Sequence, residues 1–156
     1  GEAISIYHIV GSRDWQDFCQ LDRKPVRNVE YEMIEYLKDL TPLIGAADLV
    51  ISRAGATSVS EITALGIPSI LVPLPNSPGG HQEENARFFE REGSAIVVRD
   101  SELNYVSLSN RISLLLTEDL ILKDMAKKAK SSRHLTGGEK IADLIFNIIN
   151  GGFDGK

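Results

Sequence analysis

The stretch SRAGATSVSE at residues 52–61 joins small residues, hydroxyls and one carboxylate where an apolar segment gives way to a helix-like one. The Ala-Gly-Ala run at 54–56 leaves the backbone open to close approach by a phosphate or a sugar. Thr57 and Ser58 add hydroxyl donors, and Glu61 lies one turn into the helix. Its carboxylate is placed to accept hydrogen bonds from a vicinal diol such as a ribose. These residue types indicate a ligand-binding site.

The same residues also have a purely structural interpretation. Ser58-Val-Ser-Glu61 matches a helix capping box, in which both side chains satisfy backbone N–H groups at the start of a helix. The stretch matches neither the G-x-G-x-x-G dinucleotide pattern nor the G-x-x-x-x-G-K-[ST] phosphate loop. Spacing alone therefore leaves capping and ligand binding both open.

A second stretch, HQEENARFFE at residues 81–90, begins another helix-like segment. Gln82 and Asn85 are three residues apart, so they share one helix face and present two amides suited to sugar hydroxyls. Ala86 and Phe89 continue toward the core. A polar first helical turn with no ligand accounts for the same residues, and this alternative also stays open.

No metal or cofactor is expected from the remaining reactive side chains. His8, His81 and His134 are too dispersed to form a metal site, and the sequence has no Asp-x-Asp pair. No Ser-His-Asp or Cys-His arrangement is evident.

Cys19 is the only cysteine, which excludes a disulfide within the chain and favours a reducing compartment. Its neighbours Trp15, Phe18 and Leu21 predict a buried thiol. The sequence has neither an 18-residue apolar run nor a signal-peptide pattern, so it is expected to be cytoplasmic, with no transmembrane segment.

The 156 residues, 42% of them hydrophobic, suffice for one domain with a sizeable core. The 17 Lys and Arg are scattered through a chain of net charge −5, which makes nucleic acid an unexpected partner. The lysines at 123–130 alternate with apolar residues and predict a solvated helix face before a membrane-surface patch.

Short β-branched runs alternate with helix-like segments along the chain. Strands are predicted at residues 3–10, 26–31, 48–52, 69–74 and 95–99, and helices at 14–23, 41–47, 58–65, 81–92, 103–117, 119–130 and 138–150. This order predicts an α/β fold, a Rossmann-like parallel sheet of about five strands flanked by helices, with a helical C-terminal region. Residues 1–150 are expected to form the domain and 151–156 a flexible tail. In such sheets ligands bind at the carboxyl ends of the strands, where both stretches fall.

Read together, the two stretches resemble the donor-binding half of the MurG-type UDP-N-acetylglucosamine transferases of peptidoglycan synthesis, members of the GT-B class. The resemblance extends from about residue 7 to 149, and its specific parts are the S-R-A-G-A…S-E block, the G-I-P step and the H-Q-x-x-N-A block. It implies a sugar-nucleotide-binding domain of a hexosyltransferase.

The resemblance also implies roles for individual residues. Glu61 matches the carboxylate that holds the uridine ribose, and the 53–57 loop lines the nucleotide pocket. Leu37 matches the segment whose backbone reads the uracil, and the helix start at 81–85 faces the N-acetylglucosamine hydroxyls. The implied binding residues are Leu37, Arg53, Ala54, Gly55, Ala56, Thr57, Ser58, Glu61, His81, Gln82 and Asn85.

One departure from the family's pattern is a further strand and a Gly-Gly-Ser-x-Gly-Ala turn, which open the family's donor domain and precede the point where this sequence begins. In the family the helix start after this turn cradles the diphosphate, so donor binding is expected to be weakened here. We therefore expect a fragment whose sheet must close up, pair with another chain or tolerate a cavity. The acceptor half and its catalytic base are outside it as well, so no catalytic residue is assigned and the fragment alone is expected to be inactive.

The full enzyme implied by the resemblance transfers N-acetylglucosamine with inversion to the lipid-linked muramyl-pentapeptide, at the cytoplasmic face of the plasma membrane. Helix dipoles and backbone N–H groups stabilise the departing UDP in place of a metal. Two alternatives stay open: a free-standing sugar-nucleotide-binding subunit of a two-chain transferase, and part of a UDP-N-acetylglucosamine 2-epimerase.

Overall fold

The computed structural model describes residues 3–21, 24–132 and 146. The chain divides into two compact units, Gly1–Leu40 and Thr41–Lys156, and each is described by itself. The five predicted strands are present, and every strand pairing is parallel. They belong to two sheets, of two and three strands.

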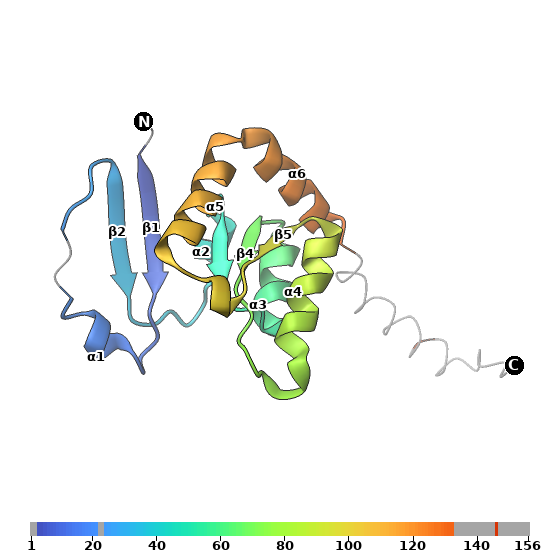
Figure 1. The fold of residues 1–156 in the computed structure, drawn as a ribbon, viewed down its shortest axis with the longest axis horizontal. Coiled ribbons are helices and arrows are strands. Elements are labelled where there is room, and N and C mark those ends of the chain that lie inside the picture. The colour runs from blue at the N-terminus through green and yellow to red at the C-terminus, as the bar shows by residue number, and fades with distance from the viewer. Residues whose placement is uncertain (1–2, 22–23, 133–145, 147–156) are drawn as a thin grey trace, which may run out of the picture. The chain divides into compact units, whose positions relative to one another are not determined.

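The first unit is a parallel pair of strands joined by a short helix. β1 (Ile4–Ile9) lies alongside β2 (Val29–Ile34), and α1 (Trp15–Phe18) forms a single turn between them (Figure 1). No described residue of this unit is buried, and Ile6 and Tyr7 are 42% and 51% exposed. Parallel strands are normally covered on both faces, so this unit lacks the core that such a pair requires.

The thiol prediction is wrong, because Cys19 is exposed. The helix predicted at residues 14–23 ends at Phe18, so Cys19 forms its C-cap instead of lying inside a longer amphipathic helix. The side chain of Cys19 lies 3.5 Å from the Gln16 carbonyl oxygen, to which its thiol donates. Leu21, expected to cover the thiol, is 55% exposed.

The second unit is built on a sheet of order β3-β4-β5. Its strands are β3 (Val50–Ser52), β4 (Ser69–Leu71) and β5 (Ala95–Val97). Its helical segments are α2 (Thr41–Gly45), α3 (Ala56–Ala64), η1 (Pro78–Gly80), α4 (His81–Glu92), η2 (Asp100–Glu102), α5 (Tyr105–Thr117) and α6 (Asp119–Lys130). This is the predicted α/β alternation followed by a helical C-terminal region.

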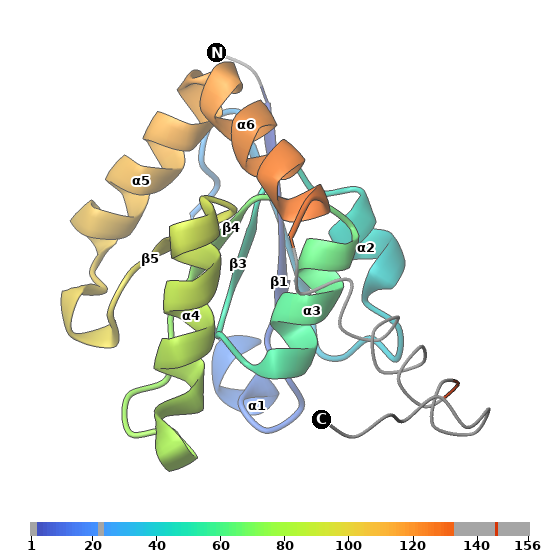
Figure 2. The same ribbon diagram turned by 90° about the vertical axis from the view of Figure 1, so that its right-hand side faces the viewer.

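Helices pack on both faces of the three-stranded sheet. Leu71 joins a buried cluster with Val59 of α3 and Phe89 of α4. The adjacent Ile70 joins a second cluster with Leu115 of α5 and Met125 of α6. Because neighbouring residues of a strand point to opposite faces, the first cluster places α3 and α4 on one face of the sheet (Figure 2). By the second cluster, α5 and α6 supply apolar side chains to the other face. The core of the unit lies in these two layers.

The helix ends show which start and stop signals could be recognised in the sequence. α3 ends at Ala64, and Gly66 with φ of 71° and Pro68 follow, as the Gly-Ile-Pro step predicts. α5 begins with a capping box between Asn104 and Ser107, which lacks the Glu or Gln that the usual sequence pattern requires. The helix predicted at 138–150 lies outside the described residues.

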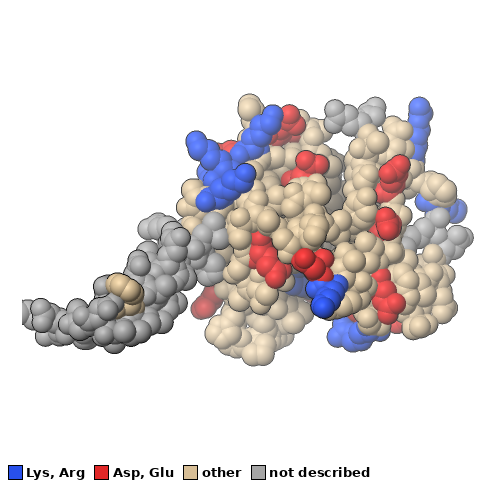
Figure 3. Space-filling view, turned by 180° about the vertical axis from the view of Figure 1, so that it is seen from behind, with Lys and Arg blue, Asp and Glu red and all other residues tan. Residues whose placement is uncertain are grey.

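Charged side chains of both signs share the surface in Figure 3. The predicted lysine face of α6 is exposed, and two of its lysines pair with carboxylates one turn earlier, Lys123 with Asp119 and Lys128 with Asp124. Among the described helices, none combines the length and apolar character needed to cross a membrane.

Candidate ligand-binding site

The first site stretch forms the turn from β3 into α3. Arg53, Ala54 and Gly55 connect Ser52, the last residue of β3, to Ala56, the first residue of α3. Ala54 is fully buried, whereas a Cβ placed on Gly55 would meet no atom within 4 Å. Gly55 has φ of −65°, which any residue can adopt, so the backbone does not require glycine here. The absence of a side chain instead keeps the space in front of the helix open.

The capping-box interpretation of this stretch is wrong. α3 begins at Ala56, two residues before the predicted start, and its N-cap is Gly55. Ser58 is therefore the third helical residue, and Glu61 lies in the second turn. No side chain caps the helix, and its first turn carries no acidic residue. The first N–H groups of α3, which precede the first helical hydrogen bond from Val59 to Gly55, face the open space with the positive end of the helix dipole.

The Glu61 side chain points away from the core. The buried face of α3 carries Val59, Ile62 and Thr63, whereas Thr57 and Glu61, one helical turn apart, are both exposed. Within the part of the chain that the structure describes, no hydrogen bond or ion pair involves the Glu61 carboxylate. Glu61 is therefore free to receive a ligand and contributes no cap.

The second site stretch forms the first part of α4, which follows the loop after β4. The Gln82 side-chain oxygen accepts a hydrogen bond from the Leu74 N–H at 3.0 Å, and the Gln82 N–H donates to the Ser77 hydroxyl at 3.3 Å. Gln82 thus holds the loop that precedes its own helix. The His81 ring lies over Gly79, where a Cβ would come within 2.6 Å of Nε2. Gly79 also has φ of 64°, so both the close approach and the backbone favour glycine there.

Asn85 brings the two stretches together. Its side-chain nitrogen donates to the Ala54 carbonyl at 3.1 Å, across 31 residues of sequence. The amide of Asn85 is therefore partly used by the protein itself. Its side-chain oxygen, and the side-chain nitrogen of Gln82, form no further hydrogen bond among the described residues. The N-terminal ends of α3 and α4 consequently lie side by side at the carboxyl ends of β3 and β4.

Sequence reasoning missed one member of this edge, Asp100. Arg53 Nη1 donates to Asp100 Oδ1 at 2.7 Å and to the Val72 carbonyl at 3.3 Å. Asp100 is 47 residues from Arg53 and carries no motif. The only available signal was its place after a predicted strand. The Glu83–Arg87 ion pair of α4, at 3.0 Å, joins residues four apart, which lie on one face of the helix.

Leu37 belongs to the other unit, Gly1–Leu40, in the segment after β2, and is half-buried. Its predicted place in the same pocket stays a prediction. In the described part of the chain, no group of three or more His, Cys, Asp or Glu side chains is arranged to hold a metal ion.

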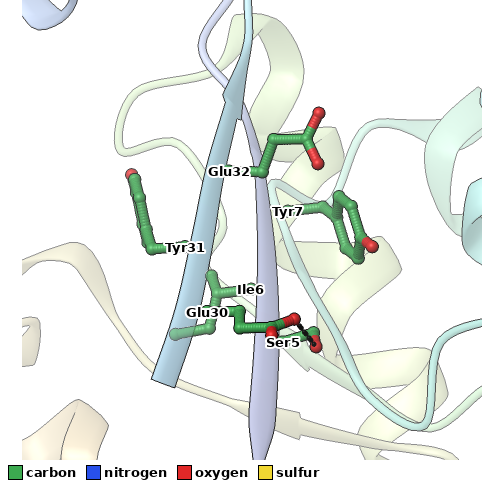
Figure 4. Close-up of a pocket in the computed structure, with 6 residues that line it drawn as sticks. All are labelled: Ser5, Ile6, Tyr7, Glu30, Tyr31 and Glu32. Atoms are coloured by element: carbon green, nitrogen blue, oxygen red, sulfur yellow. Dashed lines mark hydrogen bonds between the residues drawn. The ribbon is translucent and has the colours of Figure 1, made fainter. Parts of the chain in front are cut away.

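A hollow on the first unit is lined by six residues of β1 and β2 (Figure 4). Ser5 donates to Glu30 at 3.4 Å, and Tyr7 and Glu32 extend on the same side of the strand pair, whereas Tyr31 extends on the other side. The lining side chains therefore extend on both sides of the strand pair, and the hollow is no enclosed pocket.

Parallel strands with helices on both faces, and two helix starts adjoining at the strand ends, define an α/β protein of the Rossmann-like class. The model of the glycosyltransferase family 28 C-terminal domain matches residues 1–141, and the chain belongs to this family.

The similar proteins are transferases. A protein of Halothermothrix orenii named UDP-N-acetylglucosamine--N-acetylmuramyl-(pentapeptide) pyrophosphoryl-undecaprenol N-acetylglucosamine transferase is 44% identical over 95% of this chain and 41% of its own length. The protein of the same name from Oenococcus oeni is 40% identical over 84% of this chain and 35% of its own length. The crystal structure of Acinetobacter baumannii MurG matches with a TM-score of 0.79 at 27% identity, over 93% of this chain and 42% of that one. This chain thus spans about two fifths of the length of the relatives it matches.

Proposed function

We propose that this chain binds UDP-N-acetylglucosamine as the donor-binding part of an inverting hexosyltransferase of peptidoglycan synthesis. The observation that carries the proposal is the Asn85–Ala54 hydrogen bond, which sets the uncapped start of α3 beside the amides of α4. The free Glu61 carboxylate lies on the exposed face of α3, one helical turn after Thr57. The names of the relatives support the choice of donor. Residues 1–150 would form this sugar-nucleotide-binding domain.

Each side chain has a role that its surroundings permit. Glu61 accepts hydrogen bonds from the ribose diol, and the first N–H groups of α3 face the diphosphate. The free amide atoms of Gln82 and Asn85, with His81 beside them, bind sugar hydroxyls. The backbone at Leu37 reads the uracil. The nucleotide pocket is lined by the segment that comprises Arg53, Ala54, Gly55, Ala56, Thr57 and Ser58.

In the transfer, an acceptor hydroxyl attacks the anomeric carbon, and the bond from that carbon to the UDP oxygen breaks with inversion. Negative charge then grows on the departing diphosphate, which the positive end of α3 stabilises. The acceptor would be the lipid-linked muramyl-pentapeptide, and the whole enzyme would act at the cytoplasmic face of the plasma membrane. This chain alone would bind the donor and not transfer the sugar.

Titration of the ¹⁵N-labelled chain with UDP-N-acetylglucosamine, UDP-glucose and UDP tests the proposal. The donor is expected to shift the amides of residues 53–61 and 81–85 and of Leu37. UDP should leave the 81–85 amides largely unmoved, because it carries no sugar. Absence of a response at both helix starts, with the chain folded, would contradict the proposal.

A further inference from the structure

The Arg53 guanidinium ties together the carboxyl ends of all three strands of the second sheet. Arg53 directly follows β3, Val72 directly follows β4, and Asp100 comes after β5. One nitrogen of Arg53 donates to the Asp100 carboxylate at 2.7 Å and to the Val72 carbonyl at 3.3 Å. Asp100 therefore holds Arg53 across the edge of the sheet where the two helix starts lie.

The turn between β3 and α3 is thereby fixed at successive residues. Arg53 is held by Asp100, and the carbonyl of Ala54 accepts from Asn85 at 3.1 Å. Ala54 itself is fully buried against α3 and α4. The next residue, Gly55, has open space in front of it and leads into the first N–H groups of α3. A turn fixed in this way orders the donors before any ligand arrives, which lowers the entropy cost of binding.

We propose that Asp100 is a positioning residue for the nucleotide diphosphate, acting through Arg53 on the turn that aims the start of α3. The proposal rests on the function proposed above. It assigns no contact between Asp100 and the ligand, because its carboxylate is engaged by Arg53.

The exposure of the pair allows binding to be separated from stability. The side chains of Arg53 and Asp100 are 49% and 39% exposed, and exposed ion pairs contribute little to folding. A second ion pair at the same end of the sheet, Arg99 with Glu102 at 3.5 Å, is 57% and 50% exposed and holds no part of the turn. Glu102→Gln is thus a matched control for Asp100→Asn.

The test measures the Kd of UDP-N-acetylglucosamine by calorimetry, and Tm, for the chain and its variants. Asp100→Asn is expected to raise the Kd about tenfold with Tm unchanged, and Asp100→Glu to restore much of the affinity. Glu102→Gln should change neither quantity. Adding Asp100→Asn to Arg53→Gln should weaken binding little further, because the two residues act as one unit.

An unchanged or lowered Kd in Asp100→Asn would overturn the proposal, and a lowered Kd would show that Asp100 withholds Arg53 from the ligand. Amide hydrogen exchange without ligand gives a second readout that does not depend on donor binding. Failure of the unaltered chain to bind the donor can therefore be told apart from failure of the proposal for Asp100. Residues 55–57 are expected to exchange about fivefold faster in Asp100→Asn than in Glu102→Gln. Equal exchange would overturn the proposal whatever the ligand.

Discussion

Glu61 illustrates how the position of one carboxylate along a helix decides its chemistry. At the third helical residue it would have satisfied a backbone N–H. In the second turn of α3 it shares the exposed face with Thr57 and has no side-chain partner among the described residues. An exposed acid with no structural bond is expected to be dispensable for stability, so an effect of its removal on binding reports directly on ligand contact.

Glu61→Gln is expected to raise the Kd of UDP-N-acetylglucosamine at least about tenfold, because a charge-assisted hydrogen bond contributes about 1.5–3 kcal/mol. The free energy of unfolding should stay within about 0.5 kcal/mol of the original. Calorimetry and urea titration measure the two quantities. Glu118→Gln, which removes an exposed carboxylate that caps no N–H at the start of α6, is the control.

The ribose assignment has a sharper version of this test. A uridine donor that lacks the ribose 2′- and 3′-hydroxyls should bind the unaltered chain and Glu61→Gln equally. A loss of affinity for this donor in the variant would contradict the diol contact. It would place the carboxylate against another part of the ligand.

Gly55 is a position where the backbone does not require glycine but the space in front of the helix does. Gly55→Ala meets no atom within 4 Å and keeps a permitted φ of −65°, so its free energy of unfolding should change by less than about 1 kcal/mol. Its methyl group would nevertheless stand in the open space in front of α3. We therefore expect weaker donor binding with nearly unchanged stability, measured by calorimetry and chemical unfolding. Unchanged affinity would remove the ligand from this space.

At the scale of the element, Gly66 terminates α3 and has φ of 71°. A Cβ there would lie 2.3 Å from Cγ of Lys130, whose side chain crosses it from α6. Gly66→Ala is expected to lower the free energy of unfolding by about 1–2 kcal/mol, chiefly from the left-handed backbone, because the flexible lysine can move aside. Urea titration measures this change, and donor affinity should persist.

The control for this change is Gly45→Ala at the end of α2. Gly45 has no positive φ, and its Cβ would approach only Leu65 at 4.0 Å. That variant should keep or raise the free energy of unfolding, because alanine restricts the unfolded chain. Equal losses of unfolding free energy in Gly45→Ala and Gly66→Ala would contradict the prediction. They would show that the left-handed backbone of Gly66 does not cause the loss.

The elements also show how much of the fold could be predicted from the sequence. β-branched runs predicted the five strands, since each run is short and bounded by turn residues. The start of α3 was misplaced because Ser58 and Glu61 mimic a capping box, whereas an N-cap glycine carries no side-chain signal. The Asn85–Ala54 and Arg53–Asp100 bonds span 31 and 47 residues and could not be read from spacing at all. Local signals predict elements, but only the fold decides which polar groups meet.

At the scale of the whole molecule, the two units differ in what holds them together. β4 is bonded on both sides, and its residues are at most 4% exposed. β1 and β2 are bonded only to each other, in a unit with no buried residue among those described. A pair of strands without a covering layer is marginal in water. The division into units therefore predicts unequal local stability.

Amide hydrogen exchange of the intact chain is expected to reveal this inequality. The amides of β4 should exchange at least about 100-fold more slowly than those of β1 and β2, because β4 opens only when the layered core does. Dilution provides the control, since protection of β1 that falls with concentration would indicate strand pairing between copies of the chain. Concentration-independent protection equal to that of β4 would contradict the prediction, and would mean that the apolar side chains of the first unit are covered in solution.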